Sequence, residues 1–197
     1  MINKEQTITI FDLETNGFKG SSVLSISALE IKYLETMNKF GIVNVYSRFY
    51  FPNEGEKIKD SALKIHGLDE ARIKELRDGV DYPNYFKNDI ESFLTFSKNS
   101  SIYVAHNIKF DSSFIPFSGK DIELFCTMEN NIFINRSGKW PTLEETAKYY
   151  EIKLDRKMLH ASNYDVYLCF EIFNAMYLNK NKNLLPLLSK KGFLNDN

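Results

Sequence analysis

The chain contains 197 residues, of which 43% are hydrophobic and 14% aromatic, so it is long enough and apolar enough for one globular domain with a full core. This composition excludes an intrinsically disordered chain. The 25 lysine and arginine residues nearly balance the 26 aspartate and glutamate residues, which excludes nucleic-acid binding through a uniformly cationic surface.

The first part of the chain predicts a β unit. The segments 7–14, 23–32 and 42–51 are rich in β-branched and aromatic residues, and the short connections between them favour an antiparallel meander. Along the first segment Ile8, Ile10, Asp12 and Glu14 share one face, because strand side chains alternate. Two carboxylates therefore end an otherwise apolar strand face.

The middle of the chain alternates helical patterns with buried strands. Apolar residues at helical spacing predict helices over 61–66, 69–76, 84–98 and from Phe110 or Asp111 onward. Short apolar runs predict strands over 101–105 and 122–128, and a polar loop is expected over 130–138. This alternation is typical of an α/β protein with a mixed central β-sheet flanked by helices.

The last part of the chain predicts two more helices and a tail. Thr142 and Glu145 have the spacing of a capping box, which marks a helix start, and a final helix is expected from about Ser162 to Leu178. We therefore expect one domain over 1–178 and a basic, partly apolar tail over 179–197. Packing of this tail on its own domain is favoured over docking to a partner.

Cellular location is constrained by the cysteines and by the apolar runs. Cys126 and Cys169 lie far apart without other cysteines or histidines at ligand spacing, which supports neither a disulfide scaffold nor a zinc site. The apolar runs are shorter than the ~20 residues that span a membrane. We expect a cytoplasmic protein without a targeting or membrane segment.

Four acidic residues follow predicted strands or belong to the final helix. Asp12, Glu14 and Asp111 follow buried strands and are expected to meet at one sheet edge, with Asp165 supplied by the last helix. Each pair of such charges costs on the order of 4 kcal/mol at ~4 Å and an effective dielectric of about 20, so the cluster needs cations. Oxygen ligands favour Mg²⁺ or Mn²⁺, and two such ions serve phosphoryl displacement.

A histidine lies close to this acidic set in the sequence. His160 precedes Asp165 by five residues, which is about 140° around a helix, so we expect it on the loop before the last helix. An imidazole with a pKa of about 6.5 is suited to accept a proton from an attacking water. Without the acids, a histidine at a helix start would be interpreted as structural.

Three segments together resemble the exonuclease motifs of the DEDDh group: Phe-Asp-Leu-Glu-Thr-Asn-Gly-Phe at 11–18, Val-Ala-His-Asn-x-x-Phe-Asp at 104–111 and His-Ala-x-x-x-Asp at 160–165. The chain is similar to the DnaQ-like 3′→5′ exonucleases, a family that includes the proofreading ε subunit of bacterial replicative polymerase. The resemblance extends from Thr7 to Leu178. It implies a ribonuclease H-like exonuclease fold in which Asp12, Glu14, Asp111 and Asp165 hold two Mg²⁺ or Mn²⁺ ions and His160 is the general base.

The resemblance also implies substrate contacts. The segment expected to line the 3′-terminal nucleotide comprises Thr15, Asn16, Gly17 and Phe18, with Phe18 as a wedge against the base. His66 resembles the histidine of a His-Gly-Ile element, although a helix-end histidine before a glycine cap is an equal explanation. Asn107 resembles an asparagine of the second motif, and a structural hydrogen bond would explain it as well. Phe110 is expected in the core.

Some positions depart from the family pattern. Ser25 stands where many relatives carry a glutamate in the second strand. The tyrosine subgroup of this superfamily places its base at the position of Ala161, which leaves His160 as the base here. Oligoribonuclease-type relatives follow Asp-Leu-Glu with Met-Thr-Gly, whereas this chain has Thr-Asn-Gly.

The expected activity is release of nucleoside 5′-monophosphates from the 3′ end of DNA, preferably single-stranded. The alternatives are a 3′→5′ exoribonuclease of the same superfamily and a non-catalytic nucleic-acid or polymerase-binding module. No residue in the sequence identifies a reader of the 2′-hydroxyl, so DNA and RNA stay open at this point. A polymerase subunit is a candidate partner for the tail.

Overall fold

The computed structural model describes residues 6–117 and 121–194. Its strands are β1 (Thr7–Thr15), β2 (Val23–Leu34), β3 (Lys39–Phe49), β4 (Ser100–Ala105) and β5 (Glu123–Cys126). Its helices are α1 (Asp60–His66), α2 (Glu70–Arg77), α3 (Ile90–Phe96), α4 (Ile108–Asp111), α5 (Leu143–Tyr149), α6 (Ser162–Leu178) and α7 (Leu184–Lys190). Short 3-10 helices are η1 (Glu35–Met37), η2 (Phe86–Asn88), η3 (Ser112–Phe114) and η4 (Glu129–Ile134).

The strands form one five-stranded sheet in the order β3-β2-β1-β4-β5. The pairs β1–β2 and β2–β3 are antiparallel, so the predicted meander is confirmed. The pairs β1–β4 and β4–β5 are parallel, which makes the sheet mixed as expected. Because β1 and β4 run side by side in the same direction, the residues that follow both strands meet at one edge of the sheet.

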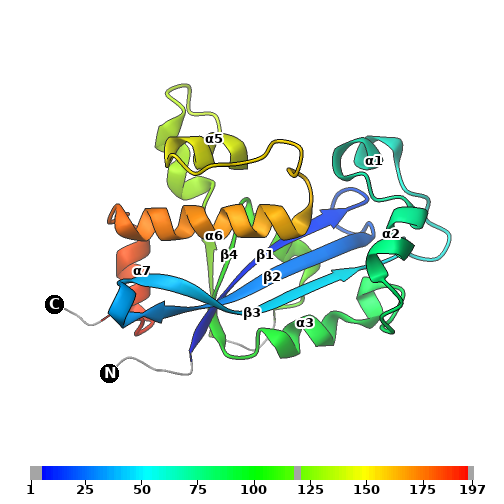
Figure 1. Ribbon diagram of the computed structural model, residues 1–197, viewed down its shortest axis with the longest axis horizontal. Coiled ribbons are helices and arrows are strands. Elements are labelled where there is room, and N and C mark those ends of the chain that lie inside the picture. Colours follow the sequence, from blue (N-terminus) through cyan, green and yellow to red (C-terminus); the bar gives the residue numbers. More distant parts are fainter. Residues whose placement is uncertain (1–5, 118–120, 195–197) are drawn as a thin grey trace.

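Helices cover both faces of the sheet. In Figure 1, α6 lies along one face with α5 beyond it, and α3 lies on the opposite side. Ile8 and Ile10 of β1 belong to the core cluster that contains the buried face of α6, whereas Phe11 and Leu13 belong to the cluster on the side of α3. The alternation predicted for β1 is therefore present, and it directs Asp12 and Glu14 toward the α6 side.

Some predicted elements have different bounds. The helix predicted over 84–98 is wrong in its first half, where η2 precedes the shorter α3. Asp89 separates the two with a non-helical backbone (φ −125°, ψ 3°), because its side chain pairs with Arg48 on β3. The loop expected over 130–138 begins instead with η4, in which Asn131 is fully buried and donates to the Thr127 carbonyl at 2.8 Å. The helix expected from Phe110 or Asp111 begins at Ile108.

The segment after α6 packs on the domain. The apolar residues Leu184, Leu188 and Phe193 are buried in the same core cluster as the inner face of α6. The predicted capping box of α5 is also present, with Thr142 and Glu145 exchanging hydrogen bonds. Within the described residues, no helix has the length and apolar character of a membrane span.

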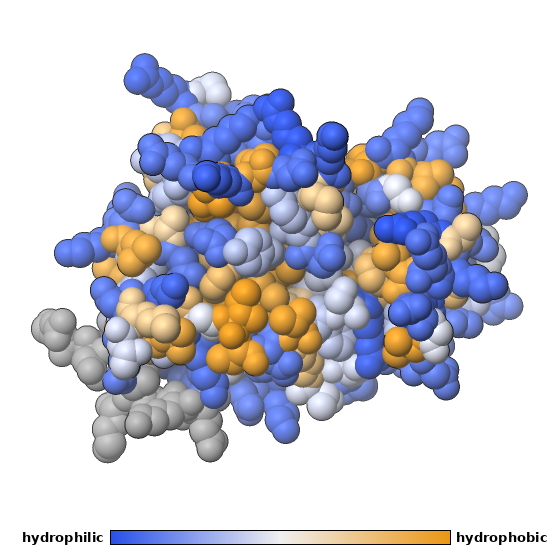
Figure 2. Space-filling model, in the orientation of Figure 1, coloured by the Kyte–Doolittle hydropathy of each residue, from blue (hydrophilic) through white to orange (hydrophobic). Residues whose placement is uncertain are grey.

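Side-chain oxygens accept hydrogen bonds from backbone N–H groups of the edge strand β3. Ile42, Val43 and Val45 are exposed on it, and Figure 2 shows an apolar patch over the middle of this face. Its backbone N–H groups donate to side-chain oxygens at three positions: Phe40 to Asn174 (2.9 Å), Val45 to Asn44 (3.0 Å) and Phe49 to Tyr82 (3.0 Å). These bonds occupy groups that an added strand would need, which protects the edge.

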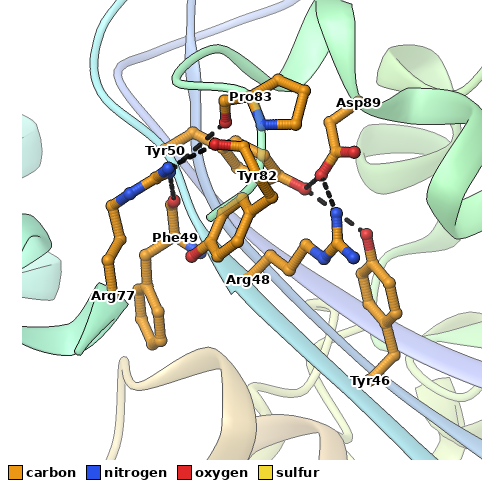
Figure 3. Close-up of polar contacts among 8 residues, drawn as sticks. All are labelled: Tyr46, Arg48, Phe49, Tyr50, Arg77, Tyr82, Pro83 and Asp89. Carbon is orange, nitrogen blue, oxygen red and sulfur yellow. Dashed lines mark hydrogen bonds and ion pairs between the residues drawn. The ribbon is translucent and has the colours of Figure 1, made fainter. Parts of the chain in front are cut away.

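A polar and aromatic cluster fastens β3 to the segment before α3 (Figure 3). The buried Asp89 carboxylate pairs with Arg48 and accepts a hydrogen bond from the Tyr50 hydroxyl at 2.9 Å. The ring centroid of Tyr82 lies 4.7 Å from the guanidinium carbon of Arg48 and 3.9 Å from that of Arg77, within the range of cation–π attraction. One carboxylate thus binds Arg48 of β3 and Tyr50, the residue that follows the strand, and anchors the segment before α3.

Removing this carboxylate is expected to destabilise the fold. Asp89→Ala would leave the Arg48 guanidinium without its partner and the buried Tyr50 hydroxyl without its acceptor, at a cost of about 2–4 kcal/mol in the free energy of unfolding. Urea denaturation measures this cost. Asp81→Ala is the matched control, because Asp81 is exposed. Equal unfolding midpoints for the two variants would contradict the role of Asp89.

Candidate active site

The end of β1 presents two carboxylates toward the start of α6. Asp12 and Glu14 lie opposite Ser27 and Ser25 of β2 and follow the two isoleucines that pack beneath α6. A register irregularity between Glu14 and Thr15 ends the regular pairing. The sequence expectation that both carboxylates share one face is confirmed by this placement.

Asp111 reaches the same region from the parallel neighbour of β1. It lies at the end of α4, which follows β4 after a left-handed residue, Asn107 (φ 85°). Its side chain is 3% exposed, and Oδ1 accepts a hydrogen bond from the backbone N–H of Leu13 at 3.2 Å. Asp111 is therefore tied to the strand residue that stands between the two carboxylates of β1.

Asp165 and His160 come from the start of α6. Asp165 lies in the first turn, and His160 lies on the preceding loop with a left-handed backbone (φ 66°), as its spacing predicted. The backbone N–H of His160 donates to Asp165 Oδ2 at 3.0 Å. One candidate ligand atom each from Glu14, His160 and Asp165 lie within 4.8 Å of one another. The imidazole of His160 is exposed beside the carboxylates.

A buried serine cluster fixes the start of α6 to the sheet. Ser162, 2% exposed, has its hydroxyl 3.0 Å from that of Ser25 and 2.9 Å from that of Ser27. The Ser25 hydroxyl therefore helps hold the helix that carries Asp165.

Burial and mutual repulsion disfavour the charged form of these acids. Burial and the charges of Asp111, Glu14 and Asp165 raise the pKa of Asp12 well above its usual value. Burial, with the charges of Asp165 and Asp111, raises the pKa of Glu14 to about 8. Burial also raises the pKa of Asp111 to about 8 and that of Asp165 to about 6. Cations bound at this site would favour the ionised carboxylates and so offset both the burial and the mutual repulsion.

The donor set fits hard divalent cations. All four acids supply oxygen ligands, which suit Mg²⁺ or Mn²⁺. Asp165 Oδ1 is buried and has no hydrogen-bond partner among the described residues. Burial of a carboxylate oxygen without a partner is costly. A metal ion would supply the missing partner.

A pocket of about 360 Å³ opens beside the acids. One wall is the end of β1 and the turn after it, from Leu13 to Phe18, and the other is formed by Lys59 and α1. Phe18 is 85% exposed, so its ring is free to contact a ligand. Phe110, which the sequence analysis assigned to the core, is only partly buried and lines this pocket.

The residues predicted to contact substrate differ in their freedom to do so. Thr15, Asn16, Gly17, Phe18 and His66 all line the pocket. The Thr15 hydroxyl donates to the Gly17 carbonyl at 2.7 Å, which shapes the turn. The side chain of Asn16 is fully buried and hydrogen-bonded within the protein.

Asn107 lies outside this pocket lining. Its side chain is exposed and makes no hydrogen bond with the described residues. The structural hydrogen bond considered as an alternative for Asn107 is therefore not found there.

The other two histidines have distinct surroundings. His66 Nδ1 accepts a hydrogen bond from the Leu68 N–H at 2.9 Å, and burial lowers the pKa of His66. The neutral ring therefore carries its proton on Nε2, which is buried and faces the backbone of Thr15 across the pocket. His106 lies between Thr127 (3.0 Å) and the Pro141 carbonyl (3.1 Å), and burial lowers its pKa to about 4, so it is structural.

Comparison with known proteins identifies similar chains. The exonuclease family RNase_T matches residues 9–173. The DNA polymerase III subunit epsilon of Buchnera aphidicola is 31% identical over 186 residues, which cover 89% of this chain and 74% of that protein. Ribonuclease T of Actinobacillus pleuropneumoniae is 25% identical over 194 residues, covering 91% and 88%. In structure, exonuclease X in complex with 5′-overhanging duplex DNA matches the fold with a TM-score of 0.59 at 22% identity, over 88% of this chain and 93% of that one.

Proposed function

This chain belongs to the DnaQ-like 3′→5′ exonuclease family, and from that membership we propose that it hydrolyses single-stranded DNA from the 3′ end and releases nucleoside 5′-monophosphates. The observation that carries the proposal is the meeting of four repelling carboxylates, two of them buried and two partly buried, beside an open pocket. Asp12, Glu14, Asp111 and Asp165 are assigned as the ligands of two Mg²⁺ or Mn²⁺ ions. When bound, such ions stabilise charge on the attacking and leaving oxygens of a phosphodiester.

His160 is assigned as the general base. Its exposed imidazole makes no hydrogen bond with the described residues, so it is free to take a proton from an attacking water. The bond from its backbone N–H to Asp165 Oδ2 keeps the loop beside the carboxylates while the ring stays unconstrained. This arrangement supports transfer of a proton from water to the imidazole.

The pocket is assigned to the 3′-terminal nucleotide. Phe18 and Phe110 offer aromatic surface to the base, and the ring of His66, whose tautomer is set by the Leu68 N–H, lines the same pocket. Thr15 and Gly17 line the wall through their turn. A paired terminus would have to unstack before its nucleotide entered, which favours single strands.

DNA is favoured over RNA because the epsilon subunit of a DNA polymerase is more similar to this chain than ribonuclease T is. Ribonuclease T keeps exoribonuclease activity as the second candidate. Competition between 5′-labelled DNA and RNA of the same sequence in one reaction is the test. We expect the DNA to shorten at least about tenfold faster in kcat/KM, and faster loss of the RNA would assign the second candidate.

A partner and a location are assigned with the function. Lys180 and Lys182, two exposed lysines of segment 179–197, are assigned as the contact for a polymerase subunit, because apolar residues of this segment are buried in the core. We place the protein in the cytoplasm. A non-catalytic binding module would not need four carboxylates that repel phosphate, and metal-dependent nucleotide release would exclude it.

A further inference from the structure

The turn after β1 is fastened to the segment before α1 by a compact hydrogen-bond network, here called the latch. Its members are Asn16 and Ser22 from the turn and Glu56 from the segment that leads to α1. Glu56 accepts from Asn16 Nδ2 at 2.5 Å, from the Ser22 backbone N–H at 3.1 Å and from the Ser22 hydroxyl at 2.5 Å. Asn16 is 0% and Ser22 2% exposed.

The directions of these bonds require a carboxylate at position 56. The Ser22 hydroxyl accepts a hydrogen bond from the Asn53 N–H at 2.6 Å, so its own proton points to Glu56. Each of these three groups is therefore a donor to Glu56, and the Asn53 side chain adds a further donor. Although burial raises the pKa of Glu56, the hydrogen bonds from Ser22 and Asn16 lower it below the usual value. A glutamine would turn an N–H group toward these donors.

The amide of Asn16 is used completely within the latch. Nδ2 also donates to the Lys57 carbonyl at 2.9 Å, and Oδ1 accepts from the Lys59 N–H at 2.6 Å. The amide therefore has no donor left for a nucleotide, in contrast to the sequence expectation. Asn16 also distinguishes this chain's Thr-Asn-Gly from the Met-Thr-Gly of oligoribonuclease-type relatives.

The latch joins the two walls of the pocket. Thr15 and Gly17, the immediate neighbours of Asn16, line one wall, and Ile65 and His66 of α1 line the other. Figure 1 shows α1 beside the end of β1. The spacing is tight, because a Cβ placed on Gly17 would lie 2.9 Å from Lys59 Nζ. A change in the latch therefore alters the distance between groups that would hold the base.

We propose that the latch of Asn16, Glu56 and Ser22 is a positioning device that sets the width of the nucleotide pocket and thereby the affinity for the 3′-terminal nucleotide. This inference rests on the proposed function. Asn16 and Glu56 are positioning residues, because they act through the turn and α1 and do not touch the carboxylates. Loosening the latch weakens substrate binding but leaves the reaction of bound substrate at its original rate.

Steady-state kinetics of Glu56→Gln on a 5′-labelled single-stranded oligonucleotide tests this role. We expect KM to rise about tenfold while kcat stays within about threefold, because ground-state contacts are lost and the acids are not moved. Glu54→Gln is the matched control, since Glu54 is exposed and lies on the same segment. It should keep the wild-type KM. A Glu56→Gln enzyme with unchanged KM would overturn the proposal. A loss of about tenfold in kcat without a change in KM would overturn it as well.

An exchange variant separates positioning from loss of stability. In Asn16→Asp with Glu56→Gln, the donor and the acceptor swap places, so the contact between the two side chains is restored. KM of the double variant should fall below that of either single variant, although the Lys57 carbonyl stays without its donor. Simply additive KM values would contradict the latch. If Glu56→Gln does not fold, Ser22→Ala removes the two hydrogen bonds of the hydroxyl, to Glu56 and from the Asn53 N–H, and must still raise KM.

Failure of this inference differs from failure of the proposed function. If the wild-type enzyme shortens no oligonucleotide with Mg²⁺ or Mn²⁺, the proposed function fails. If the wild-type enzyme is active and Glu56→Gln matches Glu54→Gln in KM, only the latch proposal fails.

Discussion

Replacing Asp111 by Asn will lower the rate of nucleotide release by at least about a thousandfold and will raise the melting temperature of the metal-free protein. The loss of activity is expected because an assigned metal ligand loses its charge. The gain in stability is expected because Asn keeps the Oδ1 acceptor for the Leu13 N–H while removing a buried charge whose pKa is raised to about 8. One pKa unit corresponds to about 1.4 kcal/mol, so a gain of roughly 1–3 kcal/mol in unfolding free energy is expected.

Thermal denaturation in EDTA and single-turnover cleavage with Mg²⁺ measure the two effects of this substitution. Asp81→Asn makes the same change of charge at an exposed position and should alter neither quantity. An Asp111→Asn protein that is inactive but less stable than the wild type would show that Asp111 is a structural residue rather than a metal ligand.

The second large effect concerns pH. The stability of the metal-free protein should fall as the pH rises, whereas the stabilisation by bound metal should increase. The folded-state pKa values of Glu14 and Asp111, about 8, and of Asp165, about 6, lie above those of the unfolded chain. Their contribution to stability is therefore fully present only below about pH 4 and is lost as the pH rises toward about 8. The metal-free protein should melt at a lower temperature at about pH 9 than at about pH 6.

Mn²⁺ should raise the melting temperature more at the higher pH, because the ligands must be ionised to bind it. Partly exposed carboxyls such as Glu144 do not contribute to this change of stability with pH. Ion pairs lower the pKa of Glu144, so it titrates below the pH window. Thermal scans with Mn²⁺ and with EDTA across this range provide the measurement. A Mn²⁺ shift of equal size at both pH values would contradict the assignment of these acids as ligands.

The acidic cluster could be predicted from the sequence because its signals are local. Asp12 and Glu14 share a face by strand alternation, and the five-residue spacing from His160 to Asp165 separates a loop residue from a helical one. Parallel neighbours bring Asp111 to the same edge. The meander, the capping box at Thr142 and the bounds of α6 rest on equally local patterns.

What the sequence did not reveal depends on distant partners. Asn16 belongs to a turn whose residue types are typical of ligand binding, but its side-chain amide donates a hydrogen bond to Glu56, 40 positions away. The helix predicted over 84–98 loses its first half because Asp89 pairs with Arg48 on β3, 41 positions earlier. For Asn16 and Asp89 a tertiary contact overrides a local preference. Phe110 was expected in the core as an apolar residue, yet it lines the pocket.

Digestion of a 5′-labelled single-stranded oligonucleotide with Mg²⁺, Mn²⁺ or EDTA, by the wild type and by His160→Ala, tests the assigned metal-dependent site most directly. The expected result is a metal-dependent ladder that shortens from the 3′ end. In His160→Ala it should form about 10²–10⁴-fold more slowly, because only the proton acceptor is removed. A ladder that persists in EDTA, or one that forms at the same rate in His160→Ala, would contradict the assignment of the acids and of His160.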